Sequence, residues 1–150
     1  MDKINRYERI LNKAVPILKE SKMDDIGKMS IIASILKTEF NEWIFCGFYR
    51  VVKERLLEIG PYQGNVIACS HIHFDNGVCG AAATLNKTII VKDVLSFPNY
   101  IACDSDTVSE IVVPLIKNKK LLAVLDIDGH KIGQFDEDDK SYLEKILLLI

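Results

Sequence analysis

The stretch SEIVVPLIKNKKLLAVLDID, residues 109–128, decides the sheet of this chain of 150 residues. Two apolar segments, 109–116 and 121–128, flank the polar sequence Lys117-Asn118-Lys119-Lys120. Apolar runs of this length with a short polar connection are typical of a β-hairpin. We therefore predict two adjacent antiparallel strands, with Lys119 and Lys120 at the tip.

Further extended segments lie on both sides of this hairpin in the sequence. Aromatic and β-branched residues predict a strand over 43–52, and shorter strands are predicted over 55–59 and 88–91. Residues 65–74 also read as extended, whereas GPYQG (60–64) reads as a Pro/Gly break. Residues 93–106 show no clear period, which predicts a long ordered loop of the kind that often carries function.

Helical periodicity predicts the remaining elements. Apolar residues recur at helical spacing over 4–19 and 25–40, small residues favour a short helix over 77–85, and an acidic first turn opens a helix over 136–150. Two helices, then mostly strands, then a helix indicate an α+β fold. We expect one domain over residues 1–150, with a central antiparallel sheet and the N-terminal and C-terminal helices packed against it.

Composition excludes several classes of protein. The chain is 49% hydrophobic and 27% charged, and 19 basic against 21 acidic residues give a net charge of −2. A nearly neutral chain has no basic field for nucleic acid, and no segment offers the roughly 18 apolar residues of a membrane span. The N-terminus MDKINRYERI lacks an apolar signal core, so we expect a cytoplasmic protein whose cysteines serve catalysis or redox exchange.

The four cysteines differ in their surroundings. Cys46 lies inside an aromatic strand and is expected to be an inert core residue. Cys69, Cys79 and Cys103 each lie near polar turn residues, and no pair has C-x-x-C spacing. From spacing alone, these three could equally be reactive or structural. Cys103 has the strongest local case, because its polar loop can leave a thiol accessible and tuned by backbone amides.

Three acids lie at the ends of the predicted hairpin strands. Asp126 and Asp128 share a strand face, on which Leu122 and Val124 precede them, and Glu110 opens the neighbouring strand. A simple hairpin register places Glu110 near Asp126 or Asp128, which would gather three carboxyl groups in a pocket. The alternative, slightly favoured by the residues alone, is that these acids point into water and protect a sheet edge.

The histidines do not indicate a metal site. His71 and His73 share a strand face, but no further ligands at matching spacing are evident, so we predict that both face solvent. His130 lies in a predicted turn and is expected to be exposed.

Several motifs together resemble the free methionine-R-sulfoxide reductase family, whose members are stand-alone GAF-fold proteins. They are GFY (47–49), GPYQG (60–64), GVCG (77–80), FPNYIACD (97–104), SEIVVPL (109–115) and LDID (125–128). The similarity covers about residues 45–144 in the family's order. The combination of three placed cysteines with SEIVVP and LDID is specific, since a generic GAF domain shares only the fold.

The resemblance implies a role for each cysteine. Cys103 matches the nucleophile, Cys69 the cysteine that usually closes a disulfide with it, and Cys79 a third cysteine implicated in redox turnover. We rank Cys69 above Cys79 as the resolving cysteine.

It also implies the substrate contacts. Glu110, Asp126 and Asp128 match acids that hold the substrate's amino group and sulfoxide oxygen, and Tyr49 matches an aromatic residue of the pocket. Phe45 stands where the family typically has Trp, which keeps an apolar wall but removes an indole N–H. Asn99-Tyr100 replaces the commoner Gly-His.

The implied activity is reduction of free methionine-R-sulfoxide without metal or organic cofactor, with recycling by a thioredoxin-like reductant. We expect a homodimer. The alternative function is a GAF sensor module that binds a small ligand without reaction. Turnover coupled to thioredoxin, or loss of thiols on addition of sulfoxide, would distinguish the two.

Overall fold

The computed structural model describes residues 2–20 and 22–150 of the chain. Its helices are α1 (Lys3–Glu20), α2 (Asp25–Glu39), α3 (Gly77–Leu85) and α4 (Glu137–Leu147), with a 3-10 turn η1 (Val94–Ser96). Its strands are β1 (Phe45–Lys53), β2 (Leu56–Gly64), β3 (His71–His73), β4 (Ile89–Val91), β5 (Ser109–Lys117) and β6 (Lys120–Gly129).

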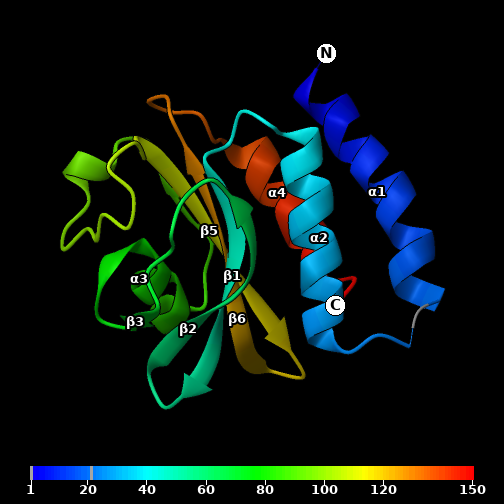
Figure 1. The fold of residues 1–150 in the computed structure, drawn as a ribbon, viewed down its shortest axis with the longest axis horizontal. Helices are drawn as coiled ribbons and strands as arrows, with labels where there is room; N and C mark the ends of the chain where they lie inside the picture. The colour runs from blue at the N-terminus through cyan, green and yellow to red at the C-terminus, as the bar shows by residue number, and fades with distance from the viewer. Residues whose placement is uncertain (1, 21) are drawn as a thin grey trace.

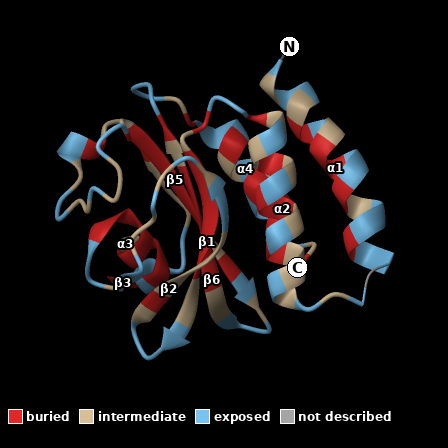
Figure 2. Cartoon of the chain, viewed as in Figure 1, coloured by how far each residue is buried: buried red, intermediate tan, exposed pale blue. Residues whose placement is uncertain are grey.

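One six-stranded sheet in the order β3-β2-β1-β6-β5-β4 forms the centre, and every neighbouring pair is antiparallel. Helices α2 and α4 cover one face and α1 packs outside them, whereas α3 covers the other face (Figure 1). Buried positions concentrate along the sheet and on the inward faces of the helices (Figure 2). The predicted α+β architecture is confirmed.

Capping interactions explain where two of the helices begin. The Asp24 side chain accepts the Gly27 N–H at 2.8 Å and starts α2. Asp136 and Asp139 form a capping box at the start of α4. Asp139 also accepts the buried Tyr7 hydroxyl at 2.7 Å, so α1 is tied to α4 by the same carboxylate.

The strand between 55 and 64 departs from the sequence prediction. GPYQG (60–64) does not end the strand; β2 continues through it to Gly64, paired with Phe45. The register shifts between Gly47 and Tyr49, which places Pro61 at a bulge where its missing N–H breaks no regular ladder bond. Conversely, the predicted extended segment 65–74 contains only the three-residue β3.

A second bulge corrects the predicted face of Leu122. The β5–β6 register shifts between Leu115 and Ile116, so Leu122 packs with the helix-side cluster and not on the face of Val124. The helix predicted to run to residue 150 ends at Leu147.

Other sequence predictions are confirmed. His71, His73 and His130 are exposed, and Cys46 is fully buried in the helix-side core. Lys119 and Lys120 lie at the exposed tip of the β5–β6 hairpin. Within residues 2–20 and 22–150, no helix is both long and apolar enough to cross a membrane.

Candidate active site

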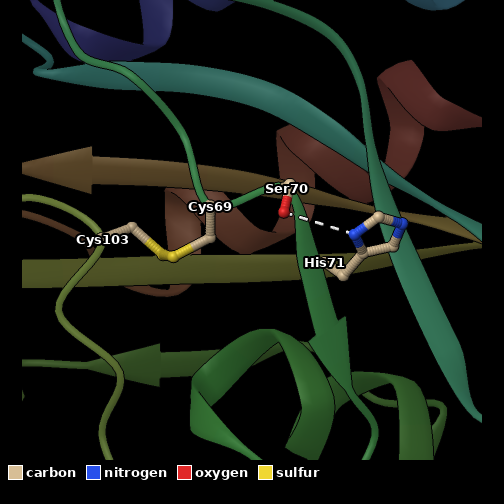
Figure 3. Close-up of a disulfide and its surroundings, with 4 residues drawn as sticks. All are labelled: Cys69, Ser70, His71 and Cys103. Carbon is tan, nitrogen blue, oxygen red and sulfur yellow. Dashed lines mark hydrogen bonds between the residues drawn. A yellow bond between two sulfur atoms is a disulfide. The ribbon is translucent and has the colours of Figure 1, made fainter.

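A disulfide between Cys69 and Cys103 joins two connections on the α3 side of the sheet. Cys69 lies between β2 and β3, and Cys103 lies in the loop between η1 and β5. Their Cα atoms are 5.4 Å apart across 34 positions of sequence, within the range of bonded pairs. Figure 3 shows the bond beside Ser70 and His71. The pairing implied by the resemblance is therefore present, and the structure is that of the oxidised protein.

The third cysteine is held in the first turn of α3. Cys79 is a free thiol, 3% exposed, facing the same cavity as Cys103. The Gly77 N–H donates to the Asn99 carbonyl at 3.0 Å, which fixes the Cys103 loop over the start of the helix. Gly80 permits the close packing of α3, since a Cβ there would collide with the His73 carbonyl oxygen.

The β5–β6 hairpin brings the three acids together. Glu110 pairs with Asp128 and Val112 with Asp126, so all three acids project from one face of the sheet. Glu110 and Asp126 are buried, and a carboxylate oxygen of each lies within 4.8 Å of the other and of the Cys79 sulfur. The predicted convergence is confirmed, and the alternative in which the acids point into water is wrong.

Burial and mutual repulsion raise the pKa of each acid. Burial raises the pKa of Glu110 and of Asp128 well above their usual values, and the Asp126 charge adds to both shifts. Burial raises the pKa of Asp126 to about 6, partly offset by the Cys79 thiol and the Glu110 carboxyl. Burial thus favours the protonated forms of Glu110 and Asp128, and a protonated carboxyl group can donate a hydrogen bond.

The thiol of Cys79 does not ionise readily in this state. Burial raises its pKa well above the usual range, and the charge of Asp126 raises it further. Among the described residues, Asp126 Oδ1 is buried without a hydrogen-bond partner, so the cluster has unused capacity to bind a donor. Cys79, Glu110 and Asp126 could also hold a divalent cation, because their ligand atoms lie close together.

Aromatic side chains form the apolar wall. The rings of Phe45 and Tyr49 lie 6.4 Å apart, and Phe45 stacks on Tyr62 at 5.4 Å. Gly47 makes room for this arrangement, since a Cβ there would collide with the Tyr62 side chain. Burial raises the pKa of Tyr49, which therefore stays a neutral hydroxyl.

The cavities of the oxidised site are small. One cavity of about 20 Å³ lies among Cys79, Cys103 and the three acids, and one of about 10 Å³ lies between Phe45, Tyr49 and Cys103. Each has room for about one water molecule. A substrate larger than water therefore requires the loop that carries Cys103 to move.

The sequence analysis missed the role of Tyr100 as a lining residue. Tyr100 borders the cavity of the acids, and burial followed by the Glu110 charge raises the pKa of its phenol. Its position three residues before Cys103, in the expected functional loop, is the signal that could have indicated it.

Comparison with known proteins agrees with this fold. A profile of the GAF domain family matches residues 29–150. The free methionine-R-sulfoxide reductase of Saccharomyces cerevisiae is 50% identical over 109 residues, or 71% of this chain and 60% of the relative. The enzyme of that name from Escherichia coli is 32% identical over 137 residues, or 91% of this chain and 82% of the relative.

A solved structure extends the comparison to three dimensions. The free methionine-R-sulfoxide reductase from Neisseria meningitidis, in complex with its substrate, superposes with a TM-score of 0.92 at 36% identity. The match covers 99% of this chain and 88% of the solved one. Fold and profile together define a GAF domain. Within that class, the chain belongs to the free methionine-R-sulfoxide reductase family.

Proposed function

We propose that this chain reduces free methionine-R-sulfoxide to methionine by a thiol mechanism, with residues 1–150 acting as one unit. The observation that carries the proposal is the convergence of the Cys69–Cys103 disulfide, the Cys79 thiol and three acids, two of them buried, on one face of the sheet. Sulfoxide reduction needs a nucleophilic thiol, a second thiol that can form a disulfide with it, and a nearby proton donor.

The acid cluster is suited to binding the ammonium group of a free amino acid. Ionised Asp126, whose Oδ1 lacks a partner within the described part of the chain, would accept a hydrogen bond from the substrate ammonium group. A peptide-bound methionine has no such group. Phe45 and Tyr49 would contact the methyl group of the sulfoxide.

The chemistry balances as three steps. Glu110 or Asp128, whose raised pKa favours the protonated form, donates a proton to the sulfoxide oxygen and makes the sulfoxide sulfur electrophilic. The Cys103 thiolate attacks this sulfur, the oxygen passes to the Cys103 sulfur as its bond to the substrate sulfur breaks, and methionine leaves with Cys103 as a sulfenic acid. The Cys69 thiol then displaces water from Cys103 and forms the observed disulfide.

A dithiol reductant of the thioredoxin type closes the cycle in this proposal. It would return two electrons by thiol–disulfide exchange and itself become oxidised. Such recycling requires a reducing compartment, which supports the proposed cytoplasmic location. Metal and organic cofactors have no part in the proposed steps.

A homodimer is also proposed, with apolar residues of α1 at the interface. Ile4 and Ile17 of this helix are 38% and 47% exposed although both are large and apolar, and they flank its buried face on opposite sides. Light scattering of the native protein would detect the dimer, and Ile17→Glu should shift it to monomer.

Turnover with defined substrates tests the proposed activity. We expect methionine formation from the free R-sulfoxide with dithiothreitol as reductant, and little from the S-sulfoxide or from a peptide-bound R-sulfoxide. Absence of turnover in a correctly folded, reduced protein would leave a ligand-binding GAF module as the function.

A further inference from the structure

An open groove runs along the outer side of the disulfide, away from the acid cluster. Its volume is about 600 Å³, and Cys103 with the adjoining Asp104, Ser105 and Asp106 forms one wall. The end of α2, the α2–β1 connection and the segment after β2 form the rest, with Lys37, Asn41, Trp43, Ile44, Asn65, Val66 and Ile67 as lining residues.

Cys103 therefore stands between two very different spaces. On the inner side are small cavities of about 20 and 10 Å³, and on the outer side is the groove of about 600 Å³. A small substrate and a protein reductant must both reach the redox pair, but only the groove has room for part of a protein.

We propose that this groove is the docking surface for the protein dithiol that reduces the Cys69–Cys103 disulfide, and that the reductant's thiolate attacks Cys103. The inference rests on the proposed function. In this step a new S–S bond forms to Cys103, the Cys69–Cys103 bond breaks, and Cys69 leaves as a thiolate. The reductant's second thiolate then displaces Cys103, so two electrons pass from the reductant to the protein.

Ile67 is the main apolar anchor in this proposal. It is 92% exposed, lies two residues before Cys69, and shares the groove with Val66, Ile44 and the edge of Trp43. A single exposed apolar residue is ordinary, but an apolar patch bordering a disulfide offers contact area to a partner.

The charge of the groove further restricts which partner protein can bind there. Asp104 and Asp106 follow Cys103 directly, against one cation, Lys37, among the groove residues that the structure describes. This imbalance favours a partner with basic groups beside its thiolate and disfavours small anionic thiols such as glutathione. The groove therefore fits a thioredoxin-class protein with an apolar, weakly basic surface around its nucleophilic cysteine.

Reduction of the oxidised protein by thioredoxin, without any sulfoxide, tests the proposal. Ile67→Glu should slow this reduction by about tenfold or more, since tenfold corresponds to about 1.4 kcal/mol and loss of an interface anchor costs at least that much. Ile67→Ala should slow it less. Reduction by dithiothreitol should stay within about twofold of the wild type in both variants, because a small thiol needs no docking surface.

Leu148→Glu is the matched control. Leu148 is 83% exposed and lies outside the groove, so its variant should be reduced by thioredoxin at the wild-type rate. Equal rates for wild type and Ile67→Glu would overturn the proposal, as would equal slowing with thioredoxin and with dithiothreitol.

A trapping experiment tests the attacked sulfur. Thioredoxin without its second cysteine should form a mixed disulfide, and peptide mapping should find it on Cys103. A mixed disulfide on Cys69 would overturn that assignment. Because neither experiment contains a sulfoxide, failure of the docking proposal and failure of the proposed activity are distinguishable.

Discussion

The two faces of the central sheet use the same strands for opposite purposes. Along β6, Ala123, Leu125 and Ile127 enter the helix-side cluster, while the alternate positions Asp126 and Asp128 line the site. The helix side is closely packed and apolar, and the α3 side combines a smaller apolar cluster with three acids. Period-two alternation thus lets one strand contribute stability on one face and chemistry on the other.

Cys46 and Cys79 show how the two faces of the sheet differ around the same type of residue. Both are free thiols, both are buried, and burial raises the pKa of each. Cys46 lies in the helix-side cluster, whereas Cys79 has Glu110 and Asp126 within 4.8 Å. Burial alone therefore does not distinguish a structural thiol from one in a reactive site, but the neighbouring polar groups do.

Replacing one cysteine on each face of the sheet should give the largest difference in turnover between two variants. Cys103→Ser should lower turnover by at least about 10³-fold, because no other group can act as the nucleophile in the proposed mechanism. Cys46→Ala should keep turnover within about twofold and instead lower the free energy of unfolding by about 1 kcal/mol through a small cavity. Steady-state assays with dithiothreitol and urea unfolding measure both. Wild-type turnover in Cys103→Ser would remove the assigned role.

Substitution of an acid inside the site should lower turnover far more than substitution of an acid outside it. Glu110→Gln or Asp126→Asn should reduce turnover by ~10²–10⁴-fold, since each removes a positioned proton donor or anion. Glu58→Gln is the matched control, because Glu58 is also a strand residue but contacts Arg50 and His71 at the surface. A loss below threefold in both site variants would mean that the cluster does not take part in chemistry.

The acid cluster on the α3 side of the sheet should make the folded protein less stable as pH rises. The pKa of Asp126 in the folded protein is about 6 against a usual 3.8, so the folded state binds this proton more tightly than the unfolded state. Its stabilising contribution is complete below about pH 4 and is lost as pH rises through about 6.

Comparison of Asp126→Asn with the wild type isolates this effect. The variant should unfold with a free energy similar to the wild type near pH 4 and exceed it by about 3 kcal/mol at pH 7, from roughly two pKa units at 1.36 kcal/mol each. Urea unfolding of the oxidised proteins across pH 4–8 provides the measurement. A pH-independent difference between them would contradict a raised pKa.

The smallest effect concerns the apolar wall of the site. Phe45→Trp restores the indole N–H that the family typically has, and one hydrogen bond to bound substrate should lower KM by about 2–10-fold. The value of kcat should change less than twofold, because Phe45 has no role in proton or oxygen transfer. An increase in KM would instead indicate that the larger ring overfills the cavity.

The sequence was sufficient for features that depend on neighbours along the chain. Helical periodicity predicted α1 and α2, and two apolar runs around a polar connection within 109–128 predicted the β5–β6 hairpin. Because a hairpin closes locally, the same pattern also placed Glu110 near Asp126 or Asp128, and the observed register pairs it with Asp128. The resemblance supplied the Cys69–Cys103 pairing that spacing alone left open.

Only the tertiary structure decided what depends on packing between distant segments. It extended β2 through Pro61, moved Leu122 to the helix side by a bulge, and placed Tyr100 in the site. It also set the water exclusion that raises the pKa of Glu110, and the groove beside Cys103. Local periodicity fixes which face a side chain takes, but desolvation and cavity shape arise only when separate segments pack together, which no short pattern encodes.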